Sequence, residues 1–395
     1  MILEPDGTEV DWFVGYSPPP EKYQEQVDRA LQGIETFQSL SAQFENEPKN
    51  VEIIFKLAGK YSRRNKPEKA AELFKQVVAL DPEGKQGTTE FNNEKVTYTQ
   101  NAEFNLGTTA ISSRPPDLAP LQAFVKKYSG GVLVKEAYSR MSAYYGRTAT
   151  KEEAAKFFEE YTARFPQDAD SYAAWVSRII SDKEPLDKGI SLAQKAIDLT
   201  RKALPPTKEM PRANPYQSLA LRYSNLAQLH LLKGDKAKAA EIADEMIKYA
   251  AGLPSPPGQM PGAPVGPAMI AAPVAARVYV DAGFLDKAFA AYGPEFMMKI
   301  MDNAAMLGRY AQFWSGQGQN LESALEATKK ATALTPDSYS PWNTMSQMYL
   351  KQKNYDEALK AAEKALSLAP DQPPQIKESV KKNIDAIKAA AQEKK

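Results

Sequence analysis

Cationic and amide side chains recur along this sequence at positions that would share one face of successive helices. They lie two or five residues after each of eight regularly spaced start positions. The positions singled out are Lys56, Asn105, Arg140, Arg178, Asn225, Arg277 and Arg309, together with the aromatic Trp175. Five of the sixteen such positions are basic and none is acidic, although the chain carries 50 basic and 49 acidic residues. Arginine and asparagine present hydrogen-bond donors that suit carboxylates and the backbone of an extended peptide. The pattern predicts a peptide-binding face, and the competing interpretation is a face that is merely solvated.

Two further side chains each have two interpretations. Trp175 is either an aromatic anchor on that face or, with a shift of one residue in register, part of the core. His230 occupies the aromatic position that Tyr61, Tyr145 and Tyr349 hold elsewhere, which favours a packed structural histidine over a catalytic or metal-binding one.

Other chemistry has little support in the composition. The chain has no cysteine and one histidine, which excludes disulfides and thiol catalysis and leaves zinc binding poorly supported. Acidic pairs such as Glu152-Glu153 and Glu159-Glu160 lie on expected exposed helix faces, and phosphate-loop, dinucleotide and nucleophile-elbow motifs are missing from the sequence. We therefore expect no cofactor, no metal and no enzymatic activity.

The elements that position these side chains follow from a repeated pattern. A bulky residue is followed by apolar residues three and seven positions later, which is the stripe of an amphipathic helix, and a second helix ends near a proline. The start positions are Ile54, Glu103, Tyr138, Ala173, Tyr223, Ala272, Leu307 and Trp342, so the successive spacings are 49, 35, 35, 50, 49, 35 and 35. A unit of this length cannot bury its apolar stripe alone and must stack on its neighbours.

The clearest copy carries Trp342, Met345, Ser346 and Tyr349 on its first helix, and it resembles the tetratricopeptide repeat. The resemblance implies an all-α, right-handed solenoid of about eight helix-turn-helix repeats whose first helices form the inner groove. The pattern of the chaperone-binding members, a strict carboxylate clamp, is not reproduced.

The repeats are expected over residues 47–372, with three insertions between successive repeats near 83–98, 203–217 and 252–270. The last insertion is rich in proline and glycine, which indicates an irregular loop; it is either a ligand for a proline-recognising partner or a tolerated surface loop. Residues 373–395 are expected to form a capping helix with a buried stripe of Ile376, Val380, Ile384 and Ile387.

Residues 1–46 differ from the repeats. They are expected to form a strand, a turn at Asp6-Gly7, a second strand and helices. This segment resembles the C-terminal hairpin and helix of a thioredoxin-like domain, without the part that carries the redox cysteines. An isolated hairpin is marginal in water, so we expect Trp12, Phe13 and Tyr16 to be covered by helices or by a partner.

The sequence therefore predicts a non-enzymatic scaffold that binds a protein or peptide, with an acidic partner as one option. The alternatives are a structural subunit of a larger assembly and the C-terminal part of a thioredoxin-repeat redox protein. The formal net charge of +1 gives no case for nucleic acid, and prolines interrupt the least polar stretch, residues 261–280, which argues against a membrane span. The first residues carry no signal peptide, which indicates the cytoplasm, or an exported protein if the native start is further upstream. The oligomeric state stays open.

Overall fold

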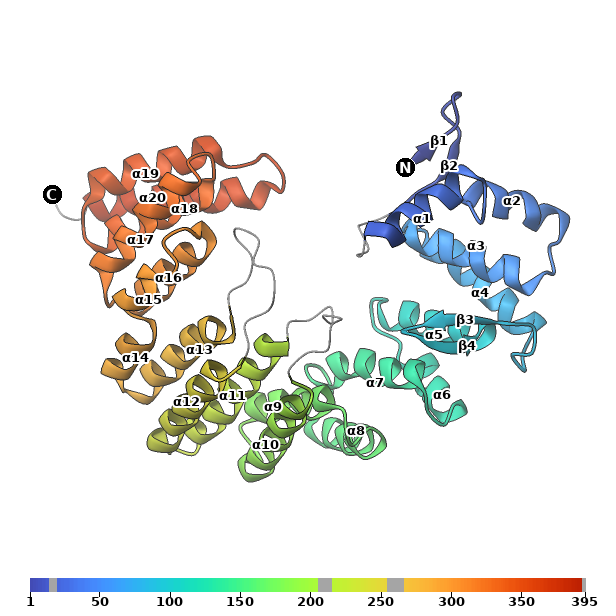
Figure 1. Ribbon diagram of the computed structural model, residues 1–395, viewed down its shortest axis with the longest axis horizontal. Coiled ribbons are helices and arrows are strands. Elements are labelled where there is room, and N and C mark those ends of the chain that lie inside the picture. Colours follow the sequence, from blue (N-terminus) through green and yellow to red (C-terminus); the bar gives the residue numbers. More distant parts are fainter. Residues whose placement is uncertain (14–19, 205–214, 254–265, 393–395) are drawn as a thin grey trace. The chain divides into compact units, whose positions relative to one another are not determined.

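The computed structural model describes residues 1–13, 20–204, 215–253 and 266–392, and these are mainly α-helical. They form two compact units, Met1–Pro166 and Gln167–Lys395, each of which stacks pairs of antiparallel helices (Figure 1). The helices of the first unit are α1 Pro20–Leu31, α2 Phe37–Asn46, α3 Val51–Arg63, α4 Pro67–Leu80, α5 Tyr98–Ile111, α6 Ala119–Lys127, α7 Val132–Tyr145 and α8 Lys151–Arg164. The sequence predicts one continuous core for all repeats, and it contains no signal for a boundary after Pro166.

The second unit continues the same construction. Its helices are α9 Ala169–Asp182, α10 Leu186–Lys202, α11 Pro215–Leu232, α12 Lys236–Ala251, α13 Pro267–Ala282, α14 Leu285–Tyr292, α15 Pro294–Met298, α16 Ala304–Gln317, α17 Leu321–Leu334, α18 Tyr339–Lys351, α19 Tyr355–Leu368 and α20 Pro374–Gln392. None of the described helices is long and apolar enough to cross a lipid bilayer.

The helix-turn-helix repeats predicted from the sequence are confirmed. Each of the eight start positions lies on the first helix of a pair, and these first helices are α3, α5, α7, α9, α11, α13, α16 and α18. The predicted stripe of the repeat at Leu307, which includes Tyr310, Ala311, Trp314 and Ala324, is completely buried. Burial of that apolar stripe against the neighbouring helices is the main stabilising contribution to each pair.

The N-terminal hairpin forms as predicted. Strand β1 Ile2–Leu3 pairs antiparallel with β2 Glu9–Asp11, and Gly7 has a φ of 88°, a value that favours glycine. Its covering is only partial, because Trp12 keeps 37% of its surface exposed and Phe13 is half-buried, while Tyr16 lies outside the described residues.

The insertion near 83–98 is not a loop but a second β-hairpin, a feature that the sequence reading missed. Strand β3 Thr88–Phe91 pairs in regular register with β4 Glu94–Thr97. Asn92 and Asn93 between them have φ values of 47° and 65°, which is the left-handed pair that a tight hairpin turn requires. The adjacent asparagines Asn92 and Asn93, residue types that tolerate the left-handed turn conformation, were the available signal in the sequence.

The other two insertions are shorter than predicted. Helix α11 begins at Pro215 and α13 at Pro267, so both helices start inside the stretches assigned to loops. A proline at the first helical position is compatible with helix initiation, because its missing N–H has no intrahelical acceptor there. Residues 205–214 and 254–265, which include most of the proline- and glycine-rich stretch, lie outside the described residues.

The C-terminal helix α20 packs on α19 and α18, as expected of a cap (Figure 1). Val380, Ile384 and Ile387 are buried, while Ile376 near its start is half-buried. Asn383 also donates a hydrogen bond of 2.6 Å to the hydroxyl of Ser346 on α18.

One glycine sets the spacing of a helix pair in the first unit. A Cβ added at Gly107 of α5 would lie 2.5 Å from a methyl carbon of Leu121 and 3.3 Å from the backbone nitrogen of the same residue. Leu121 of α6 is fully buried, so it has little room to move. At Gly59 of α3, in contrast, an added Cβ meets nothing within 4 Å.

We therefore expect Gly107→Ala to lower the free energy of unfolding by about 1–2 kcal/mol, because overpacking outweighs the gain in helix propensity. Gly59→Ala should be neutral or stabilise by up to about 1 kcal/mol, since only the propensity changes. Urea denaturation followed by circular dichroism compares the two variants, and equal stabilisation by both would contradict the close approach of α5 and α6.

Candidate binding surface on the first helices

The described residues of α3 present a continuous cationic face. Lys56, Lys60, Arg63 and Arg64 follow one another at spacings of four, three and one residues, which places them on one side of the helix. Asn50 caps the helix by accepting a hydrogen bond from the backbone N–H of Ile53, and the basic residues near its C-terminus are favourable to the helix dipole. Local sequence thus starts the helix at Asn50 and concentrates positive charge near its C-terminus.

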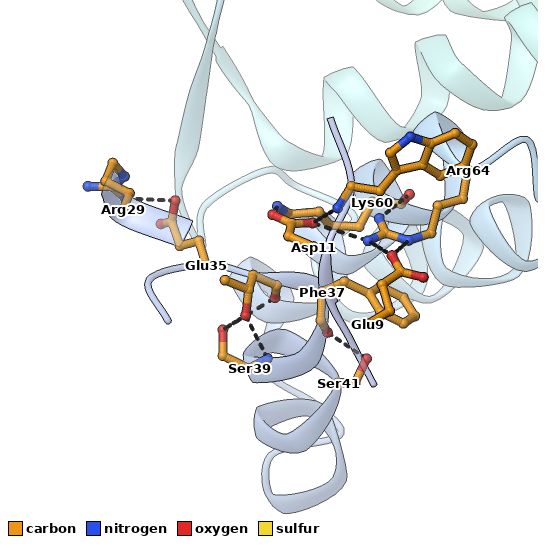
Figure 2. Close-up of polar contacts among 11 residues, drawn as sticks. Glu9, Asp11, Arg29, Glu35, Phe37, Ser39, Ser41, Lys60 and Arg64 are labelled. Atoms are coloured by element: carbon orange, nitrogen blue, oxygen red, sulfur yellow. Dashed lines mark hydrogen bonds and ion pairs between the residues drawn. The ribbon is translucent and has the colours of Figure 1, made fainter. Parts of the chain in front are cut away.

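Strand β2 lies against this face as an extended acidic segment, as Figure 2 shows. Arg64 donates hydrogen bonds from Nε to Oε1 of Glu9, at 2.8 Å, and from Nη2 to Oδ1 of Asp11, at 3.1 Å. Lys60 forms an ion pair with the other carboxylate oxygen of Asp11. Because Glu9 and Asp11 are two residues apart in a strand, both carboxylates reach the same side.

Because Asp11 and Arg64 are buried, the loss of this contact costs more free energy than the loss of a surface ion pair. Asp11 is only 1% exposed, and the guanidinium of Arg64 lies 4.1 Å from the ring centroid of Phe37 on α2. A buried charge that loses its partner costs about 3–5 kcal/mol, so the hairpin is held in place by its acidic residues.

The protonation state of Asp11 depends on the same contacts. Burial alone would raise the pKa of the Asp11 carboxyl, but hydrogen bonds from Lys60 and from the backbone N–H of Trp12, together with the charge of Lys60, lower it below the ordinary value. The carboxylate is therefore charged at neutral pH.

A second carboxylate, Glu35 in the segment between α1 and α2, contacts the N-terminal part of the same face. Lys56 donates to its Oε1 at 2.6 Å, and Arg29 of α1 donates to Oε2 at 3.0 Å (Figure 2 shows the Arg29 contact). The hydrogen bond from Lys56 is the largest influence on Glu35, and it lowers the pKa of that carboxyl. Lys56 also pairs with Glu52 one turn earlier on α3.

A cavity of about 370 Å³ opens between the hairpin, α1, α2 and α3. Lys56 and Gly59, the two positions of the first repeat that the sequence assigns to the groove, both line it. Thr89 of β3 contributes as well, so the hairpin that the sequence reading missed also belongs to the site.

The remaining predicted residues of the first unit lie on the neighbouring first helices, and α3, α5 and α7 pack side by side. Asn105 of α5 is half-buried and donates to the side-chain oxygen of Asn101 at 2.5 Å. Arg140 of α7 is exposed, and its Nε lies 2.9 Å from Oε1 of Glu136, one turn earlier on the same helix.

In the second unit the predicted residues separate into two groups. Trp175 and Arg178 of α9 are buried: the ring of Trp175 packs in the core with Lys188 above it at 4.2 Å, and Arg178 bonds Asp182 at 2.6 Å. Of the two interpretations of Trp175, the structure therefore has the core position. The other three lie on first helices as half-buried or exposed side chains, namely Asn225 on α11, Arg277 on α13 and Arg309 on α16.

Several residues of the α3 site escaped the sequence analysis. The groove positions that the repeat register predicts include Lys56 but not Lys60, Arg63 or Arg64. The sequence predicts a hairpin around the two acidic residues of β2 but gives them no binding role. The helical spacing of the four basic residues was the available signal. The pairing partners were not predictable, because they are 49 to 55 residues away in the sequence.

His230 of α11 is partly buried, as its position in the repeat predicts. Burial is the main cause that lowers the pKa of its imidazole, while Asp235, whose Oδ2 lies 3.9 Å from Nδ1, acts in the opposite direction. Among the described residues, no group of histidine, aspartate and glutamate is arranged to hold a metal ion.

Comparison with known proteins bears on the fold. Residues 340–372 match the tetratricopeptide repeat family, and no curated protein matches the chain. Among solved structures, yeast Tom70 is 14% identical with a TM-score of 0.44, covering 93% of this chain and 87% of that one. A tetratricopeptide repeat protein from Parabacteroides merdae is 11% identical with a TM-score of 0.42, covering 86% of this chain and 98% of that one.

Residues 340–372 therefore carry a tetratricopeptide-repeat motif, and the other described helices stack in helix-turn-helix pairs of the same kind. Stacking of short helical repeats builds an extended surface.

The pKa of Asp11 gives a test of the seated hairpin. A lowered pKa in the folded state contributes stability above the unfolded value of about 4, and this is lost as the pH falls through the folded value. We expect the hydrogen-exchange protection of residues 1–13 to be constant from pH 7 to 5 and to decline below about pH 4.

Asp11→Asn should lower that protection at pH 7 and flatten its dependence on pH. Asp6→Asn is the matched control, because the Asp6 side chain is exposed and accepts only from Thr8 of the same hairpin. A pH profile of Asp11→Asn identical to that of the wild type would contradict the role given to the Asp11 carboxylate.

Proposed function

We propose that this protein is a non-enzymatic scaffold that binds an extended acidic segment of a partner protein along the cationic positions of its first helices. The observation that supports the proposal is the ion-paired packing of β2 against α3. There the chain's own extended strand is held through Glu9 and Asp11 by Lys60 and Arg64 of a first helix. The same chemistry is available to a foreign segment wherever a first helix carries exposed cations.

Exposed cations of this kind occur in both units. Arg140 and Arg277 each pair with a carboxylate one turn away, Glu136 and Asp281, on their own helix. Such exposed pairs contribute only about 0–1 kcal/mol, so a partner carboxylate can replace them at little cost. Arg309 is exposed on α16, and no ion pair is found for it among the described residues.

Because first helices pack side by side, the contacts that each can make form a row within each unit. Helices α3, α5 and α7 adjoin in the first unit, as do α9, α11 and α13 in the second. An extended partner segment gains a modest contact from each helix in turn. Because the helices are already folded, the conformational entropy lost on binding is mainly that of the partner segment. Arginine adds geometric selection, since its planar guanidinium can hold a carboxylate through two parallel hydrogen bonds.

A structural subunit of a larger assembly is the second candidate. The N-terminal hairpin favours it, because Met1, Leu3 and Trp12 expose apolar surface and the strands of β1 and β2 have unpaired outer edges among the described residues. Native mass spectrometry distinguishes the two: a stoichiometric complex that survives 0.5 M salt supports the subunit, whereas complexes that dissociate with salt support the scaffold.

The scaffold proposal predicts that Arg140→Glu combined with Arg309→Glu reduces the capture of partner proteins from a lysate at least tenfold. Each reversal replaces an attraction of up to about 1 kcal/mol by a repulsion of similar size from an acidic segment, and the two changes add. Affinity capture with quantitative mass spectrometry provides the measurement.

The matched control is Lys75→Glu combined with Lys329→Glu, which makes the same change of charge at exposed positions on the second helices α4 and α17. If a partner is lost equally from both double variants, its binding depends on the net charge of the protein and not on the first-helix positions. A partner retained by the first-helix variant would contradict the proposal.

A further inference from the structure

The cavity beside α3 has more positive charge than its own carboxylates neutralise. Arg29, Lys56, Lys60 and Arg63 line it, against two carboxylates, those of Asp11 and Glu35. Both of these have a lowered pKa and remain ionised at neutral pH, so the lining residues carry an excess of two positive charges, one of which is offset by Glu52, the partner of Lys56 just outside the lining.

Arg63 is the cation of this set that the chain does not neutralise. Lys60 pairs with Asp11, whereas Lys56 and Arg29 share Glu35. The Arg63 side chain is exposed, and no ion pair is found for it among the described residues. A guanidinium at the edge of a cavity offers up to five N–H donors to an entering anion.

Lys60 shows the effect of this charge excess. Burial is the main cause that lowers the pKa of the Lys60 ammonium, and the charges of Arg63 and Arg64 lower it further, although Asp11 acts in the opposite direction. An anion bound nearby would relieve that repulsion.

Apart from Gln26, Thr89 and Gly59, the rest of the lining is apolar. Leu40, Ala30, Phe55 and Ile34 contribute hydrocarbon surface to the cavity, and Leu40 belongs to the buried core of α2, α3 and α4. The volume of about 370 Å³ lies within the range of roughly 300–1,000 Å³ that is usual for small-molecule sites. A ligand that fits both surfaces has one anionic group and an apolar body.

We propose that this cavity binds a small organic anion, with its negative group held at Arg63 and Lys60 and its apolar body against Leu40 and Phe55. The site goes beyond the scaffold function, because its ligand is a free small molecule and its position is confined to the first unit. Gly59 lines the cavity, and the absence of a side chain there leaves space beside the cationic side chains.

The test uses the full chain and the dye 8-anilino-1-naphthalenesulfonate, whose fluorescence rises in apolar surroundings, with decanoate and decanol as competitors. We expect one class of bound dye that decanoate displaces at least tenfold more effectively than decanol. Arg63→Glu should weaken dye binding at least tenfold, and Gly59→Leu should abolish it by filling the cavity without a change of charge.

Lys329→Glu on α17, which makes the same change of charge at an exposed position, and Gly308→Leu on α16, where an added Cβ also meets nothing within 4 Å, are the matched controls, and both should bind the dye as the wild type does. The proposal is overturned if Arg63→Glu and Gly59→Leu bind the dye normally, or if decanol competes as well as decanoate. It is also overturned if an acidic peptide displaces the dye while decanoate does not, a result that would assign the cavity to the partner segment and leave the scaffold function intact.

Discussion

The N-terminal part of the structure depends on the neutralisation of one cationic helix face. Lys56, Lys60 and Arg63 of α3 and Arg64 at its C-cap repel one another, and partial burial removes water that would otherwise screen them. The chain supplies carboxylates from two separate segments, β2 and the connection between α1 and α2. That requirement explains why a two-stranded hairpin, which has little stability alone, is held in a defined position on the first repeat.

Apolar stripes organise the rest of the chain. Their spacing of three and four residues can be recognised in the sequence. Positions that it places in the core, such as Ile54, Tyr138, Leu307 and Trp314, are buried, whereas Trp342 and Ile376 are half-buried. Periodicity of this kind reports directly on burial, because a helix that stacks on neighbours must present a continuous apolar face. The fold class, the capping helix and the N-terminal hairpin could therefore be predicted.

The binding surface could be predicted less well, for a physical reason. The repeat register places Arg140, Arg277 and Arg309 on exposed positions of first helices, but it cannot distinguish these from Trp175 and Arg178, which are buried on α9. A shift of a fraction of a helical turn separates a groove position from a core position. The contacts of β2 with α3 and of Glu35 with Lys56 join segments far apart in the sequence, and no local pattern specifies such pairs. The likeness of residues 1–46 to a thioredoxin-like hairpin remains a prediction.

Recognition of an extended acidic segment by the first helices can be measured by hydrogen exchange in the presence of a peptide of about twelve residues. The peptide alternates glutamate and valine, as β2 alternates acidic and apolar residues. The account predicts increased protection on first helices, α7, α13 and α16 among them, and no increase with a peptide that alternates lysine and valine. Equal protection by both peptides, or protection confined to the second helices, would contradict it.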